Sequence, residues 1–78
     1  MLQRIDEDVV VTFKTVPIEV TWQGRKYEIT KVGLHHTYRK GRTLFHVFSV
    51  ESPTLFFRLV LNTDNLYWRL EEISDDNF

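Results

Sequence analysis

The sequence predicts an all-β fold: a single small domain built as a strongly curved antiparallel meander of about five or six strands. Two observations lead to this prediction. Apolar and polar residues alternate along most of the chain, and turn residues interrupt the alternation about every eight to twelve positions. No stretch shows the 3.6-residue period of a long amphipathic helix. A chain of 78 residues suits one domain, 1–78, and we expect its ordered core to span about residues 8–73.

The expected strands are separated by short turns. The segment DVVVTFK (residues 8–14) alternates apolar and polar side chains, and Pro17 then opens the strand IEVTW. Four turns precede the last strand, LYWRLEEI, and they lie at Gln23–Gly24, Arg39–Arg42, Glu51–Pro53 and Asn62–Asn65. A sheet bent this strongly hides its edges by closing, so we expect an SH3-like or OB-like partly open barrel.

The lengths of these turns set the register of each hairpin. A two-residue turn at Gln23–Gly24 pairs Val20 with Tyr27. We take the second turn as two or four residues long, the third as three and the fourth as four. These lengths place one apolar row on the inner face: Leu34, Phe45, Val47, Leu55, Phe57, Leu59, Leu61, Leu66, Trp68 and Leu70. The alternation must change parity just before this row begins, and we expect Gly33 to relieve the β-bulge that this requires.

The same register predicts a cationic row on the outer face. The residues opposite one another on four successive strands are His35, His46, Arg58 and Arg69. His36 turns inward against Phe45. Opposed arginines repel unless solvent, salt or an anion screens them. We therefore expect an anion-binding strip flanked by aromatic rings, as in barrels that hold single-stranded nucleic acid. The alternative is a solvated face on which Glu71 or the acidic tail pairs with the arginines.

Several aromatic residues have two interpretations. Phe48 and Phe56 are predicted to pair on the outer face, where exposed phenylalanines are unusual. Either the N-terminal strand covers them, or they form a homodimer or partner interface together with Tyr67. Trp68 is expected in the core. Trp22, at a hairpin end, is a candidate for stacking on a base.

Charge is unevenly distributed along the chain, although its net value is −1. Residues 1–21 carry −2, residues 22–69 carry +5 and residues 70–78 carry −4. The basic middle could attract an anion, while the acidic ends either compete for it or keep the domain soluble. The chain has no cysteine, no signal-peptide pattern and no apolar run of membrane-span length, so we expect a cytoplasmic protein without membrane contact.

No pattern of catalytic chemistry is present in the sequence. A metal site needs three or four convergent ligands, and Arg58 beside His35 and His46 would oppose a cation. Ser49 is predicted to point inward and Ser52 lies in a turn, so neither belongs to a nucleophilic triad. The glycines form no phosphate-binding loop. We therefore expect no enzyme activity, no metal and no cofactor.

The segments VPIEVTWQGRKYEITKV and LYWRLEEI resemble a family of small bacterial proteins of unknown function. That family carries a proline, a W-x-G-R-x-Y hairpin and a closing W-R-L strand, which here are Pro17, Trp22, Gly24, Arg25, Tyr27, Trp68, Arg69 and Leu70. The resemblance covers about residues 16–73. Some members lie beside, or are fused to, translesion DNA polymerases, which implies a DNA-repair neighbourhood. The middle of the family is often Trp-rich, where this chain has GLHHTYRKGR.

These observations predict a non-catalytic binding module for nucleic acid or another polyanion, present as a monomer or homodimer. The cationic row would bind the ligand, with help from Arg25, Lys26, Arg39, Lys40, Arg42 and Trp22. The alternative is a protein-interaction or homodimerisation module that uses Phe48, Phe56 and Tyr67. An acidic protein is the second expected partner.

Overall fold

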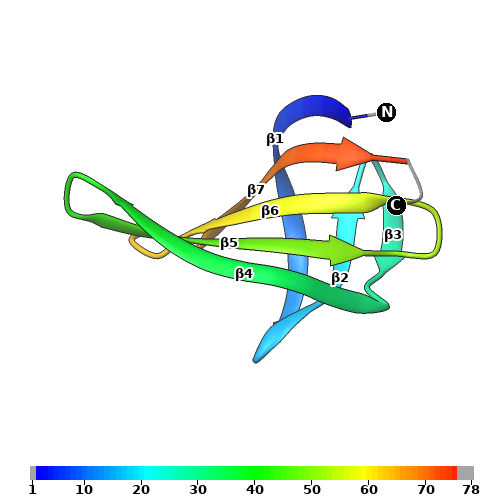
Figure 1. Cartoon of the computed structure of the whole chain (residues 1–78), viewed down its shortest axis with the longest axis horizontal. Coiled ribbons are helices and arrows are strands. Elements are labelled where there is room, and N and C mark those ends of the chain that lie inside the picture. The colour runs from blue at the N-terminus through cyan, green and yellow to red at the C-terminus, as the bar shows by residue number, and fades with distance from the viewer. Residues whose placement is uncertain (1, 76–78) are drawn as a thin grey trace.

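The computed structural model describes residues 2–75 and shows one antiparallel sheet of seven strands (Figure 1). The strands are β1 (Leu2–Lys14), β2 (Val16–Trp22), β3 (Arg25–Glu28), β4 (Lys31–Lys40), β5 (Thr43–Glu51), β6 (Phe56–Asn62) and β7 (Tyr67–Ser74). Their order across the sheet is β3-β2-β1-β7-β6-β5-β4, which leaves β3 and β4 as the two edges. The predicted all-β, antiparallel character is confirmed, and the described sheet stays open between β3 and β4.

Strand β1 joins the two halves of the sheet. Its first part pairs with β7 as far as Val9, and its second part pairs with β2 from Val10 onward. The register on β7 shifts between Arg4 and Glu7, and Asp6 within this bulge has a φ of 55°. The bent strand carries β2 and β3 behind β5 and β6 (Figure 1).

The core lies between these two halves of the sheet. Its buried members are Val20, Trp22, Phe48, Val50, Phe57, Leu59 and Leu70. Tyr27 packs edge-on against Phe57, with 5.1 Å between the ring centroids. Burial of one such apolar side chain stabilises the fold by about 1.5–3 kcal/mol, and a domain of this size depends on a few of them.

The β2–β3 hairpin has the predicted register. Val20 pairs with Tyr27, and Trp22 pairs with Arg25 across the turn Gln23–Gly24. Both turn residues have positive φ values, 51° and 75°, as a type I′ turn requires. The two-residue turn inferred from the sequence is therefore confirmed.

Gly33 lies at a β-bulge, as predicted. The register of β4 on β5 shifts between Val32 and His35. A Cβ on Gly33 would approach the carbonyl oxygen of Ser49 to 3.2 Å, so a side chain would crowd the neighbouring strand. The bulge changes the parity of the inward-facing residues of β4: Val32 faces inward before it, and His35 faces inward after it.

The register between β5 and β6 differs from the prediction, and this reverses the faces of β4 and β5. The turn between them comprises the four residues 52–55 rather than three, and Phe48 pairs with Leu59. Even-numbered residues of β5 therefore enter the core, where Phe48 is 4% and Val50 is 1% exposed. The predicted inner residues that lie on the outer face instead are Leu34, Phe45 and Val47.

The β6–β7 hairpin keeps the predicted faces in a different register. Its turn comprises residues 63–66, and Leu59 pairs with Leu70, two residues away from the prediction. A shift of two leaves every side chain on its face, so Leu59, Trp68 and Leu70 are on the inner face as predicted. Leu66 was expected on the inner face, but it lies in the turn with a φ of 62° and is 69% exposed.

Candidate nucleic-acid interface

The predicted cationic row does not form, because its four members lie on opposite faces of the sheet. His35 and His46 lie on the inner face, and Arg58 and Arg69 lie on the outer face. The register of β6 on β7 also separates the two arginines, because Arg69 pairs with Val60, and beyond a β-bulge Arg58 pairs with Glu72. The hypothesis of one continuous strip is corrected accordingly.

Carboxylates from the acidic ends of the chain hold both arginines. Arg58 Nε lies 2.9 Å from Glu71 Oε1, and Arg58 Nη1 lies 3.9 Å from Glu72 Oε1. The Nε–H group is buried without a hydrogen-bond acceptor in line, so its contact with Glu71 is an ion pair only. Arg69 Nη2 lies 2.8 Å from Asp6 Oδ1. For Arg58, this confirms the alternative in which Glu71 neutralises an arginine.

Asp6 joins two arginines at the bulge of β1. Arg4 Nε donates hydrogen bonds to both carboxylate oxygens of Asp6, at 3.0 and 2.9 Å. The hydrogen bond from Arg4, followed by the one from Arg69, lowers the pKa of Asp6 below its ordinary value. The Arg69 side chain nevertheless remains 52% exposed and accessible to a ligand.

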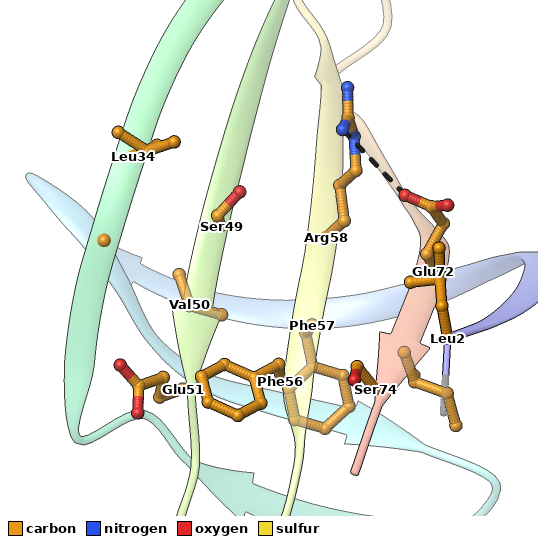
Figure 2. A pocket seen from close by; sticks show the side chains of 12 residues that line it. Leu2, Leu34, Ser49, Val50, Glu51, Phe56, Phe57, Arg58, Glu72 and Ser74 are labelled. Atoms are coloured by element: carbon orange, nitrogen blue, oxygen red, sulfur yellow. Dashed lines mark ion pairs between the residues drawn. The ribbon is translucent and has the colours of Figure 1, made fainter. Parts of the chain in front are cut away.

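An apolar groove crosses the outer face beside Arg58 (Figure 2). Its volume is about 320 Å³, and Leu34 on β4 and Leu2 on β1 stand at opposite sides of it. Phe56 also lines it, and the Arg58–Glu72 ion pair lies near Leu2. Because two glutamates neutralise Arg58, this groove offers little positive charge to an anion.

A second groove lies on the outer face toward the end of the β4–β5 hairpin, and its volume is about 340 Å³. Tyr38 pairs with Phe45, Phe45 with Asn62, and Asn62 with Tyr67, so these four residues form one row across β4, β5, β6 and β7. The rings of Tyr38 and Phe45 stack with 4.9 Å between their centroids. Tyr67 is 68% exposed. We call this row and its depression the tip groove.

Cations line part of the tip groove and lie at the adjoining hairpin end. Lys40 and Arg69 line the groove. Arg42 lies in the hairpin turn, and Arg39 pairs with Leu44 and therefore lies on the inner face at the same end. Within residues 2–75, only Arg69 of these four takes part in an ion pair. Asp8 and Glu71 line the opposite side of the groove, toward β1, so its positive end is the hairpin end.

The remaining predicted ligand residues lie elsewhere. Arg25 and Lys26 belong to β3, at the other edge of the sheet from β4. The Arg25 guanidinium lies over the Tyr27 ring, 5.6 Å from its centroid. Trp22 is only 9% exposed and packs beside Tyr27, so it offers no face on which a base could stack. The structure does not bring these residues together with the hairpin arginines.

The predicted Phe48–Phe56 pair is wrong. Phe48 pairs with Leu59 in the core, whereas Phe56 pairs with Glu51 and is half-buried on the outer face. Phe48 therefore cannot contribute to an interface. Tyr67, the third residue of that hypothesis, is exposed and belongs to the tip groove.

The three histidines are divided between the two faces. His36 lies on the outer face opposite Val47, in contrast to the inward orientation that we predicted. On the inner face His35 Nε2 lies 2.7 Å from His46 Nδ1, and the His35 ring stacks on Phe48 at 4.3 Å. In the part of the chain that the structure describes, no three His, Asp or Glu side chains gather as metal ligands would.

No protein-family model, no curated protein and no solved structure matches this chain. Residues 2–75 contain no helix of the length and apolar character needed to cross a membrane. Within residues 2–75, the tip groove combines the exposed ring of Tyr67 with Lys40, a cation that makes no ion pair there.

Proposed function

We propose that this protein is a non-catalytic module that binds single-stranded nucleic acid through the tip groove. The observation that carries this proposal is the row Tyr38, Phe45, Asn62 and Tyr67, bordered by the cationic hairpin end. Proteins that hold single strands without reading their sequence combine a positive path for the phosphates with aromatic rings for the bases. The tip groove has both components on one face.

The spacing of the row suits bases rather than phosphates alone. Neighbouring strands lie about 4.8 Å apart, so Tyr67 on β7 lies about 10 Å from Phe45 across β6. A flat base fits between these rings, above Asn62. The Asn62 amide both donates and accepts hydrogen bonds and can contact the edge of such a base. A simple polyanion would not use these groups.

Three further predictions, on barrel type, family and cellular location, accompany this proposal. The strongly curved open sheet supports an SH3-like or OB-like partly open barrel. A place in the family of small bacterial proteins with the W-x-G-R-x-Y hairpin, and with it a DNA-repair neighbourhood, would suit a nucleic-acid ligand. A cytoplasmic location would give access to that ligand.

The proposal is tested by fluorescence anisotropy of a labelled deoxythymidine decamer at low salt. Tyr67→Ala should weaken binding about tenfold, because one stacked base contributes about 1–3 kcal/mol. Tyr67→Phe keeps the ring and should bind within about twofold of the wild type. Equal affinities for the two variants would exclude stacking on Tyr67.

The electrostatic part is tested by the salt dependence of the same binding. Arg42→Ala should weaken binding and reduce the slope of log K against log salt concentration by about 0.7, the value for one phosphate contact on a single strand. Lys26→Ala, on the far edge of the sheet, is the matched control and should leave the slope unchanged. If the wild type binds no oligonucleotide at low salt, the proposed function is wrong.

A further inference from the structure

Strand β4 is a long edge strand of the sheet, paired with β5 on one side. It is ten residues long, and only Val32 is half-buried, while the others are exposed. Within residues 2–75 no strand pairs with its second side. The other edge strand, β3, has four residues. A long edge with unpaired backbone groups is a template for the addition of another strand.

The hydrogen bonding of the neighbouring strands shows which backbone groups of β4 are free. The N–H of Thr63 donates to the carbonyl of Leu44 at 3.1 Å, across β5 and β6. Antiparallel ladders alternate, so even-numbered residues of β5 direct their backbone groups to β6 and odd-numbered ones to β4. The β4 partners of those odd-numbered residues are His36, Tyr38 and Lys40. The backbone N–H and C=O groups that point away from β5, toward the free side of β4, are therefore those of His35, Thr37 and Arg39.

Two features limit the usable edge to residues 35–39. The β-bulge at Gly33 interrupts the regular ladder before His35. The hairpin turn follows Lys40. Between them the ladder is regular, and its three outward N–H and C=O pairs suit an extended segment of about five residues.

The positive charge of β4 indicates which kind of segment would bind its free edge. Strand β4 carries Lys31, Arg39 and Lys40 and no carboxylate, and Arg42 follows in the turn. Only Lys31 of these cations contacts a described carboxylate, that of Glu51 at 3.9 Å. Pairing with a second copy of β4 would bring two positively charged edges together, which is unfavourable. In an acidic segment, the residue opposite Arg39 would have its Cβ about 5 Å from that of Arg39, close enough for an ion pair.

We propose that the free edge of β4 binds an acidic, extended peptide segment of a partner protein, which adds to the sheet as an eighth strand. The inference goes beyond nucleic-acid binding, because the added strand uses the backbone of the β4 edge, whereas the tip groove uses side chains of the outer face. Both proposals use the cations of the hairpin end. Residues 35–39 supply the hydrogen bonds, and Arg39, Lys40 and Arg42 supply the charge complementarity.

The peptide itself provides the sharpest test. The probe is a fluorescein-labelled heptapeptide of alternating glutamate and valine, in two forms that carry backbone N-methyl groups either on the glutamates or on the valines. An added strand turns only every second N–H toward its neighbour. One methylated form should therefore bind at least about tenfold more weakly than the unmodified peptide, and the other within about twofold. Equal behaviour of the two forms, or no binding of the unmodified peptide at low salt, overturns the proposal.

The matched protein variants are Thr37→Pro and Thr37→Ala. Proline removes the outward N–H and keeps the hydrogen bonds to β5, whereas alanine keeps that N–H. Thr37→Pro should weaken peptide binding about tenfold with a retained thermal transition, and Thr37→Ala should not. Both should bind the deoxythymidine decamer like the wild type, which separates this proposal from the proposed function. A wild-type dimer that Thr37→Pro converts to a monomer would assign the edge to a second copy and overturn the choice of occupant.

Discussion

His35 Nε2 lies 2.7 Å from His46 Nδ1, although the two residues are not direct cross-strand partners. His35 pairs with Phe48 and His46 pairs with Thr37, so the contact runs diagonally from β4 to β5. One ring must donate and the other must accept at this distance, and the accepting nitrogen carries no proton. The prediction that these histidines lie directly opposite each other on the outer face is therefore wrong: they are in contact, but diagonally and on the inner face.

The histidine contact should contribute measurably to stability. His35→Ala removes the hydrogen bond and the ring stacked on Phe48, so we expect the free energy of unfolding to fall by about 1–2 kcal/mol. His35→Phe keeps a ring against Phe48 and should lose less. Urea unfolding at neutral pH measures both. An unfolding free energy of His35→Ala equal to that of the wild type would contradict the contact.

Phe48 and Phe56 distinguish the observed register from the predicted one. Phe48 is 4% exposed in the core, whereas Phe56 is half-buried on the outer face. Phe48→Ala should lower the free energy of unfolding by about 3–5 kcal/mol, which can leave so small a domain unfolded in water. Phe56→Ala should cost clearly less. Similar costs would support the predicted outer Phe–Phe pair instead.

The parts of the fold that the sequence predicted correctly have one dominant local signal each. The Gln23–Gly24 pair favours a two-residue type I′ turn, and this turn sets the register of β2 on β3. In β6 Leu59 and Leu61 share one parity, in β7 Trp68 and Leu70 do, and a register error of two residues leaves these residues on the same face.

Strand β5 could not be oriented in this way, because both of its faces are apolar. Val47 and Val50 are each 1% exposed, although they lie on opposite faces. The turn length then decides, and the hydrogen bonds between Ser52 and Leu55 close a four-residue turn where three residues were inferred. One added residue reversed every side chain of β4 and β5.

The tip groove was missed for the same reason, because Phe45 was assigned to the inner face. A signal was present at Gly41, the only residue of its turn with positive φ, 62°. Glycine in the first central position favours a type II′ turn, and that turn pairs Tyr38 with Phe45. The Arg58 bulge had no such signal, because its neighbours carry no glycine or proline.

The turn at Gln23 offers a substitution that should stabilise the protein. Gln23 has a φ of 51°, which is unfavourable for glutamine and well tolerated by asparagine. Gln23→Asn should raise the free energy of unfolding by a few tenths of a kcal/mol, to about 1 kcal/mol. Gln23→Val, which is β-branched, should lower it. Thermal unfolding of both variants checks the turn, and a higher melting temperature for valine than for asparagine would contradict a positive φ.

Asp6 should make the stability of the fold depend on pH at the acidic end. The hydrogen bond from Arg4, and then that from Arg69, lowers its pKa in the folded state below the ordinary value of 3.8, which the unfolded chain retains. The unfolded state therefore takes up the proton first as the pH falls. The contribution of Asp6 is complete above pH 3.8 and is lost as the pH falls through the lowered pKa of the folded state.

Asp6→Asn isolates this contribution, because asparagine keeps the size of the side chain and tolerates the φ of 55°. We expect a lower urea midpoint than wild type at pH 7, and a difference that shrinks as the pH falls below 3.8. Asp8→Asn removes the same charge from the same strand, where Asp8 makes no ion pair with the described residues, and should lower the midpoint less. A gap between wild type and Asp6→Asn that is unchanged from pH 7 down through the acid transition would show that the carboxylate's charge does not hold Arg4 and Arg69.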